Sequence, residues 1–271
     1  MHQRLLCGLL AACLTLTACQ AQESSSQQQS APPAVSEPSQ PESASPSLPT
    51  QEEPAEEADP AASGVISGQV YRNDALGFSY TFPENWTLFD AEQTLALQLE
   101  KAKAAYGDTQ ALEESIALGS LGYLLYAQAQ PHAAAAEASS TAAQEGEEPP
   151  ASPANLLLQA APAVALRDLT PAAYLEELAL QAQETYENLG GKMEFSPAEA
   201  LTVDGHEVAL LQSQVTLEAD PSGLEGGTIT VHQGYSVFLA EDWLVIGLLS
   251  AQGEADMAEG IAILQEVSFS S

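Results

Sequence analysis

Positive charge is scarce in this sequence. Its 271 residues include 6 Lys or Arg against 38 Asp or Glu, which gives a formal net charge of −32 at pH 7. A chain with so few basic residues has no positive stripe to neutralise phosphates, so we expect no nucleic-acid partner and no attraction to anionic lipid headgroups. Any association with a membrane must therefore come from something other than basic side chains.

Cysteine is absent from most of the chain. The three cysteines, Cys7, Cys13 and Cys19, all lie within the first 19 residues. The remaining residues therefore have no thiol for a disulfide, a thiolate nucleophile or a zinc ligand. A domain built from them must depend on its hydrophobic core, and a hydrophobic content of 45% is sufficient to form one.

The first residues have the pattern of an export signal. Arg4 precedes an apolar stretch of 13 residues, Leu5 to Thr17, which is shorter than the ~20 residues of a membrane-spanning helix. The stretch ends in Leu16-Thr17-Ala18-Cys19, which resembles the bacterial lipobox. The resemblance implies a signal peptide over 1–18 and a diacylglyceryl group on Cys19, and two acyl chains suffice for stable anchoring. The alternatives are a plain secretory signal with an incidental cysteine, or a poor transmembrane helix.

Residues 19–64 are predicted to form a lipidated, disordered tether. The segment after Cys19 contains eight prolines and eight acidic residues but no Lys or Arg, and Val35 and Leu48 are its only sizeable aliphatic residues. It cannot bury enough apolar surface to offset the entropy cost of ordering. We interpret it as a self-repelling spacer stiffened by proline. Loss of 1–18 leaves 5 basic and 38 acidic residues, a charge of −33.

The pattern from Val65 to the end is that of a single α+β domain. Hydrophobic residues recur with the periods of strands and helices. Strands are expected at 65–72, 76–82, 121–128, 200–203, 206–217, 228–239, 243–250 and 267–269, and helices at 91–106, 111–118, 170–189 and 254–265. The segments 155–159 and 163–167 resume the domain after an interruption. This order predicts an antiparallel sheet flanked by helices, a sandwich.

Local signals support several of these elements. Asp90 is a helix N-cap, with Leu95, Leu99 and Ala102 as the apolar stripe and Gly107 as the stop. Thr170-Pro171 begins the next long helix, and Gly190-Gly191 ends it. Asp204-Gly205 predicts a two-residue hairpin.

Residues 129–154 interrupt the domain. They contain four prolines, four glutamates and no positive charge. We predict a disordered insertion there. The alternative is an Ala-rich helix over 132–144, which has no apolar stripe.

One stretch resembles a known family. Tyr71-Arg72-Asn73, Leu76-Gly77-Phe78-Ser79-Tyr80 and Pro83-Glu84-Asn85-Trp86 resemble the start of PsbP-like (Mog1/PsbP) domains, and the later elements agree in order over about 68–270. The resemblance implies an antiparallel sheet flanked by helices. It implies no catalytic residues, because members of that fold mostly act as binding or accessory subunits. The insertion departs from the pattern.

The sequence contains no phosphate-binding glycine loop, zincin motif, GxSxG elbow or EF-hand spacing. A histidine-based site would require His206 and His232 to converge with a carboxylate such as Asp204, although surface histidines are commoner on hairpins. Trp86 and Trp243 are interpreted as core anchors, with a ligand cleft as the alternative. We therefore predict no catalytic, cofactor-binding or metal-binding residues, and Cys19 as the one modified residue.

These observations favour a non-catalytic lipoprotein, anchored at the extracytoplasmic face of the cell membrane, whose domain binds a protein partner or an envelope component. The acidity predicts a partner with a neutral or basic contact surface. The alternative is a lipoprotein that carries a small molecule or peptide. A hydrolase of envelope polymers is a third hypothesis, and the missing nucleophile motifs disfavour it.

Overall fold

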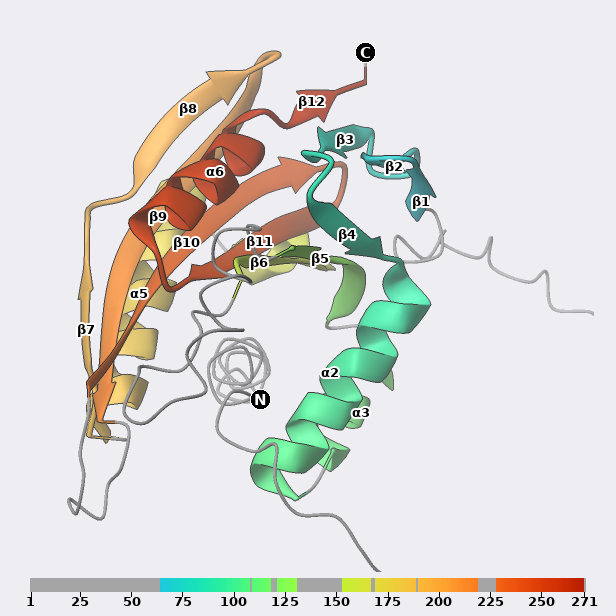
Figure 1. The fold of residues 1–271 in the computed structure, drawn as a ribbon. Helices are drawn as coiled ribbons and strands as arrows, with labels where there is room; N and C mark the ends of the chain where they lie inside the picture. The colour runs from blue at the N-terminus through green and yellow to red at the C-terminus, as the bar shows by residue number, and fades with distance from the viewer. Residues whose placement is uncertain are drawn as a thin grey trace, which may run out of the picture.

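The computed structural model describes residues 64–107, 109–117, 121–130, 153–166, 169–188, 190–218 and 228–270. They form two antiparallel sheets with helices on both faces (Figure 1). The elements in chain order are β1 (Gly64–Ser67), β2 (Val70–Asn73), β3 (Phe78–Thr81), β4 (Trp86–Phe89), α2 (Ala91–Tyr106), α3 (Gln110–Ala117), β5 (Gly122–Ala129), β6 (Asn155–Pro162), the 3₁₀ helix η1 (Ala163–Leu166), α5 (Pro171–Asn188), β7 (Lys192–Phe195), β8 (Glu199–Val203), β9 (His206–Glu218), β10 (Thr228–Ala240), β11 (Trp243–Ala251), α6 (Glu254–Gln265) and β12 (Ser268–Phe269). The predicted fold class, α+β with helices flanking an antiparallel sheet, is confirmed.

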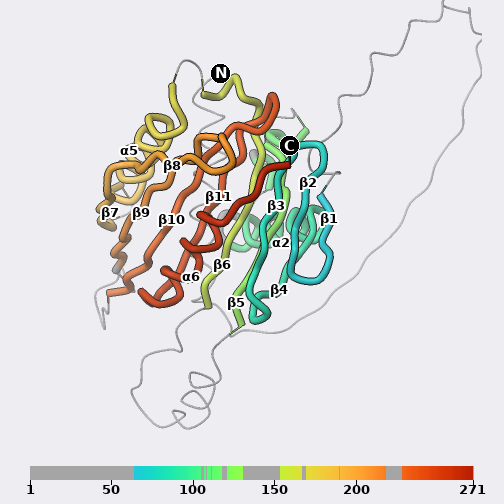
Figure 2. The backbone as a smooth tube through the Cα atoms, turned by 90° about the horizontal axis from the view of Figure 1, so that it is seen from above, coloured from blue at the N-terminus to red at the C-terminus, as the bar shows by residue number. Residues whose placement is uncertain are grey.

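The large sheet has the strand order β4-β5-β6-β11-β10-β9-β7, and β8 also pairs with β9. Figure 2 shows these strands side by side. Strands β7 and β8 share one edge of β9, because β7 pairs with residues 213–216 and β8 with residues 206–210. The long central strands β9, β10 and β11 therefore form the frame on which both edge strands are placed.

Two cores lie on opposite faces of the large sheet. Side chains alternate between the faces, so Val208 and Leu210 pack with α6 and the small sheet, whereas Ala209 and Leu211 pack with α5. We call these the α6-side core and the α5-side core. Figure 1 shows α6 on one face and α5 on the other. A sheet buried on both faces has long apolar runs, as in β6 and β11.

The small sheet has the strand order β1-β2-β3-β12. Phe78 of β3 contacts Phe238 of β10 edge to face, with ring centroids 5.2 Å apart, and so joins the two sheets. Two predicted boundaries are wrong here. The expected strand at 65–72 is a hairpin, because the chain turns at Gly68, and the expected strand at 76–82 begins only at Phe78, after a turn at Gly77.

The predicted helix boundaries are confirmed at several ends. Asp90 and Gln93 form a reciprocal capping box at the start of α2, and Gly107 follows its end with φ 71°. The Thr170 hydroxyl accepts a hydrogen bond from the Ala173 N–H in the first turn of α5. These signals act over a few residues, so they are independent of the tertiary fold.

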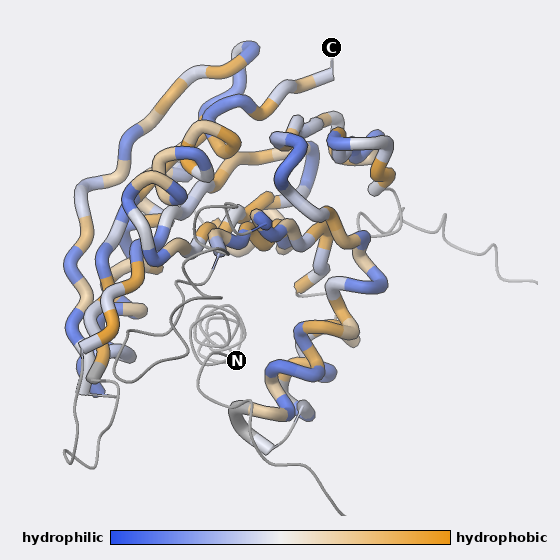
Figure 3. Tube along the Cα trace, in the orientation of Figure 1, coloured by the Kyte–Doolittle hydropathy of each residue, from blue (hydrophilic) through white to orange (hydrophobic). Residues whose placement is uncertain are grey.

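The buried face of α2 differs from the predicted stripe. Thr94, Gln98 and Ala102 are its most buried residues, whereas Leu95 and Leu99 are only half-buried. Along α2 hydrophilic and hydrophobic segments alternate (Figure 3). The prediction placed apolar residues inside by type, but the direction in which α2 leaves β4 turns Thr94 inward, where its hydroxyl donates to the Phe89 carbonyl.

Other differences concern pairing partners far along the chain. Strand β7 was not predicted, the segment expected at 155–159 extends to Pro162, and the segment at 163–167 begins as η1.

The predicted insertion at 129–154 is narrower at both ends. Ala129 belongs to β5, and its N–H donates to the carbonyl of the buried Ala154. Residues 131–152, the predicted signal peptide, Cys19 and the predicted tether up to residue 63 lie outside the described residues. No helix that the structure describes is long and apolar enough to cross a membrane.

Candidate functional site

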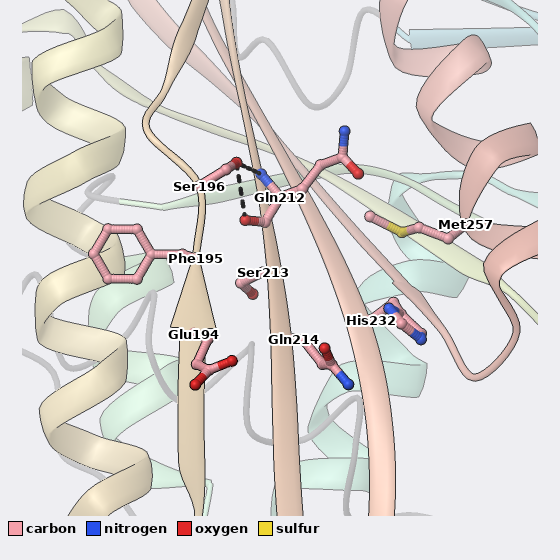
Figure 4. A pocket seen from close by; sticks show the side chains of 8 residues that line it. All are labelled: Glu194, Phe195, Ser196, Gln212, Ser213, Gln214, His232 and Met257. Atoms are coloured by element: carbon pink, nitrogen blue, oxygen red, sulfur yellow. Dashed lines mark hydrogen bonds between the residues drawn. The ribbon is translucent and has the colours of Figure 1, made fainter.

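An open concavity of about 310 Å³ lies on the α6 side of the large sheet, toward the end where β7 pairs with β9. Its lining residues come from β7, β9, β10, α6 and the residue after β7: Glu194, Phe195, Ser196, Gln212, Ser213, Gln214, His232 and Met257 (Figure 4). Figure 4 shows the side chains of Glu194, Gln214 and His232 on one side of the sheet, while the Phe195 ring is turned toward α5. The exposed part of the concavity is therefore mainly polar.

The register of three strands sets the positions of these polar groups. Glu194 of β7 lies opposite Gln214 of β9, which lies opposite His232 of β10. Cross-strand neighbours share a face and are about 5 Å apart, so the three side chains form a row across the floor. Gln212 extends the floor along β9.

One wall of the concavity is the first part of α6. Gly234 of β10 allows this helix to approach the sheet, because a Cβ there would lie 2.8 Å from Ile261 Cδ1 and 3.0 Å from Met257 Cε. At the other side, the chain leaving β7 is held to β9. The Ser196 N–H donates to the Gln212 carbonyl at 2.9 Å, and the Ser196 hydroxyl also lies against the Gln212 backbone. The α6 wall is thus fixed by close side-chain packing on Gly234, and the other side by a backbone hydrogen bond.

One carboxylate, Glu194, lines the concavity, and two more lie on the helix that supplies Met257 to its other side. Glu194 forms an ion pair with Lys192, and the hydrogen bond and charge of Lys192 lower the pKa of Glu194. On the α6 side, Glu254 and Asp256 lie in the first turn of the helix, next to Met257. Gln212 and Gln214 between them are exposed and uncharged. The site is therefore an uncharged, hydrogen-bonding floor, with an ion-paired carboxylate on the β7 side and the acidic first turn of α6 near the other side.

The opposite face of the sheet at this level is also polar, but it is covered. Ser213, Gln233 and Ser250 are directly opposite one another on β9, β10 and β11, and all are at least nine-tenths buried. The Gln233 side chain accepts from the Tyr235 hydroxyl at 2.7 Å and donates to the Tyr186 hydroxyl of α5 at 3.1 Å. This network ties the underside of the concavity to α5, so the floor has a rigid support.

The two histidines do not converge. His232 lies opposite Gln214, eight residues along β9 from His206, which corresponds to roughly 26 Å. The His206 ring stacks on Phe269 at 4.0 Å between centroids, and the neighbouring Asp204 carboxylate accepts from the Phe269 N–H. A histidine–carboxylate site would require His206 and His232 to converge with a carboxylate such as Asp204, and they do not. Among the described residues, no group of three or more His, Cys, Asp or Glu side chains could hold a metal ion.

The two tryptophans belong to the packing. Trp86 is 2% exposed, and its indole N–H donates to Glu259 of α6 at 3.0 Å. Trp243 is half-buried against the α6-side core. Their interpretation as core anchors is confirmed.

The sequence did not single out Glu194, Gln212 or Gln214. The available signal was the polar residues Gln212, Gln214 and Thr216 at every second position of one expected strand, and Thr228, Thr230 and His232 at every second position of the next. It was insufficient because β7 itself was not predicted.

Comparisons with known proteins give distant structural likenesses. No family model matches the chain, and no curated protein sequence matches it. It is similar in structure to cyanobacterial PsbP (CyanoP) from Synechocystis sp. PCC 6803, with a TM-score of 0.42, 14% identity, and 76% of this chain and 95% of that chain covered. It is also similar to LpqN of Mycobacterium tuberculosis, described as involved in cell envelope biogenesis, with a TM-score of 0.35, 14% identity, and 72% and 83% covered.

A third likeness is to the Saccharomyces cerevisiae Ran-binding protein Mog1p, with a TM-score of 0.28, 12% identity, and 69% of this chain and 78% of that chain covered. At these identities and scores, the likeness concerns the path of the chain and not the partners or chemistry of those proteins.

Proposed function

We propose that this chain is a non-catalytic lipoprotein, anchored through Cys19 at the extracytoplasmic face of the cell membrane, whose domain binds a protein partner or an envelope component through the concavity beside α6. The observation that carries the proposal is the nature of its lining. Gln212, Gln214 and His232 offer hydrogen-bonding groups on a fixed backbone, and the lining carboxylate, Glu194, is paired with Lys192. Such groups suit recognition better than bond-making, which needs an activated nucleophile or a positioned acid and base.

The shape of the concavity favours a macromolecular partner over an enclosed small ligand. Small-molecule pockets usually bury most of the ligand surface. Here Glu194, Ser196, Gln212 and Gln214 are all exposed. A carrier for a small molecule or a peptide is the second candidate, and the same polar floor is the observation in its favour.

Charge sets the expected chemistry of the partner. The chain from Val65 onward has 30 acidic and 5 basic residues. Such a field repels anionic polymers and speeds encounters with cationic ones. Capture of the partner should therefore weaken between 0.1 M and 1 M salt, where the Debye length falls from about 10 Å to about 3 Å.

Photo-crosslinking in native membranes tests the binding role. A photoreactive amino acid at position 214 should capture a partner, whereas the same group at position 110, on α3 at the opposite face, should not. Equal capture at both positions, or none at either, would remove the concavity from the proposal. Turnover of an envelope polymer that is abolished by His232→Ala would overturn the non-catalytic part.

The anchor has its own test. Cys19→Ser should move the protein from the membrane fraction to a soluble or unprocessed pool and should abolish metabolic labelling with a fatty acid. Undiminished labelling of this variant would show that the lipobox interpretation is wrong. The result does not depend on what the concavity binds.

A further inference from the structure

Gln212 and Gln214 form a short amide ladder on the floor of the concavity. They are two residues apart on β9 and both line the concavity, so their side chains repeat at about 6.8 Å along the strand. An extended peptide repeats at the same distance, because every second residue presents its backbone N–H and C=O to the same edge. Each carboxamide has both a donor and an acceptor, so it can pair with one such backbone unit.

We propose that the concavity binds an extended segment of a partner protein that contains lysine or arginine, with its backbone edge against Gln212 and Gln214. This inference rests on the proposed binding function and specifies its partner. A peptide that lies with one backbone edge on the floor directs its side chains alternately to the two sides, because side chains of a strand project perpendicular to its N–H and C=O groups. The sides of the concavity therefore contact the side chains of the peptide, and the floor binds its backbone.

Acidic residues lie near both sides of the concavity, and Glu194 is the one that lines it. Glu194 lies on the β7 side, and Glu254 and Asp256 lie in the first turn of α6 on the other. A cationic side chain directed to the β7 side meets Glu194, and one directed to the α6 side comes near the acidic first turn of that helix, whereas an acidic side chain is repelled. A Lys or Arg of the segment on the β7 side would compete with Lys192 for Glu194. This exchange of one exposed ion pair for another adds little affinity, so the selectivity comes mainly from excluding acidic segments.

The lining fits a carbohydrate less well. The aromatic ring in the lining belongs to Phe195, and Figure 4 shows that ring turned toward α5 instead of into the concavity. A sugar would therefore meet amides and the His232 imidazole but no face of a Phe, Tyr or Trp ring. An anionic polymer would be repelled by Glu194 and by the acidic first turn of α6 nearby.

Fluorescence polarisation with a labelled nine-residue peptide of alternating lysine and threonine tests the inference on the full-length protein. The double variant Gln212→Ala/Gln214→Ala should weaken binding about tenfold or more, because the hydrogen bonds that both carboxamides make with the peptide backbone are lost. Gln110→Ala on α3 is the matched control and should leave the affinity unchanged. Thermal unfolding of each variant shows whether the fold is intact.

Two changes to the peptide separate the floor from the sides. N-methylation of alternate residues keeps the charges but removes the backbone donors, and one of the two methylation registers should weaken binding to the level of the double variant. Replacement of lysine by glutamate should abolish binding. Glu194→Gln should weaken binding of the lysine peptide a few-fold and reduce its salt dependence.

Equal affinity of the wild-type protein and the double variant would overturn the proposal, because it would mean that binding follows overall charge. Full affinity of both N-methylated peptides, or preferential binding of a neutral oligosaccharide that the double variant loses, would overturn it as well. No binding of the lysine peptide would also overturn it. If the lysine peptide does not bind but position 214 still crosslinks a partner in membranes, the proposed binding function is retained. Only the inference that the partner is a basic extended peptide is then wrong.

Discussion

The two ends of the large sheet are built from the same strands but differ in what covers them. Toward the Asp204–Gly205 turn, β9 and β10 are buried on both faces, and Val208 and Phe238 have no exposed surface. Toward the other end of the same strands, Gln212 and Gln214 face solvent. Strands β9 and β10 are therefore buried on both faces at one end, whereas at the other end one face is covered and the other is polar and exposed.

The difference follows from the length and position of the covering elements. Helix α5 spans 18 residues and contacts β7, β8, β9 and β10, so it covers one face at both ends. Helix α6 spans 12 residues and packs on β10 and β11, and the small sheet lies beside it. The α6 side of β7 and of the adjoining part of β9 is left open. The comparison indicates that one end contributes most of the buried core, whereas the other leaves an exposed polar surface, to which we assign the proposed binding.

The largest expected effect is at the buried end. Phe238→Ala should lower the free energy of unfolding by about 3–5 kcal/mol, the usual cost of removing a fully buried aromatic ring. The Phe238 ring contacts Phe78 and Phe269 edge to face, at 5.2 Å and 5.1 Å between centroids, so its loss also separates the two sheets. Denaturant unfolding measures the change. A loss below about 1 kcal/mol would mean that the small sheet is not essential to the core.

The sequence predicted the elements whose signals are local. The Asp90 cap, the Gly107 stop and the Asp204–Gly205 hairpin each depend on a few neighbouring residues, and all lie where expected. The closing helix at 254–265 was also predicted with its correct bounds. Such signals do not depend on how distant strands pair in the sheet.

The candidate site could not be predicted because it depends on pairing between distant residues. Strand β7 has four residues, and its place is set by β9, which begins more than ten residues later. The row of Glu194, Gln214 and His232 exists only once that register is fixed. The sequence placed His232 within the expected strand 228–239, but it contained no signal that the face carrying His232 remains open.

Alkaline pH should act on the buried end. Burial raises the pKa of Tyr71 to about 12 from its usual 10.0, against a smaller lowering by the Asn73 hydrogen bond, and burial also raises the pKa of Tyr80. Above pH 10 the unfolded chain loses these protons before the folded chain does, so stability is fully present below pH 10 and falls toward pH 12. A shift of two units corresponds to about 3 kcal/mol.

Denaturant unfolding at pH 8, 10 and 11.5 measures this loss. Tyr80→Phe should reduce the loss and should cost little at pH 8, because the Tyr80 hydroxyl interacts with Ser236 but has no hydrogen bond of good geometry within the described residues. If Tyr80→Phe leaves the decline in stability with pH unchanged, the phenol of Tyr80 is not its source.

A smaller effect is expected at the turn that closes the buried end. Gly205 has φ 87°, and no atom lies within 4 Å of an added Cβ, so Gly205→Ala introduces backbone strain without a clash. The expected loss is about 1–2 kcal/mol. Gly253→Ser at the N-cap of α6 is the matched control. It has ordinary φ −101° and should cost nothing, because serine is a good N-cap. Equal melting temperatures for the two variants would contradict the assignment of strain to Gly205.

The smallest effect is expected at the open end, and it decides how the binding experiment is interpreted. Gln212 and Gln214 are exposed. Figure 4 shows no hydrogen bond from either carboxamide to the other lining residues. Gln212→Ala and Gln214→Ala should each change the free energy of unfolding by less than about 0.5 kcal/mol, as is usual for surface substitutions. Because the two residues are neighbours on one strand, the double variant must be measured directly and not summed from the single ones. A loss above about 1.5 kcal/mol would show that these amides support β9, and a weaker peptide affinity of the double variant would then report damage to the floor. A stability close to that of the wild type, with affinity reduced tenfold, would separate recognition at this end of the sheet from stability at the other.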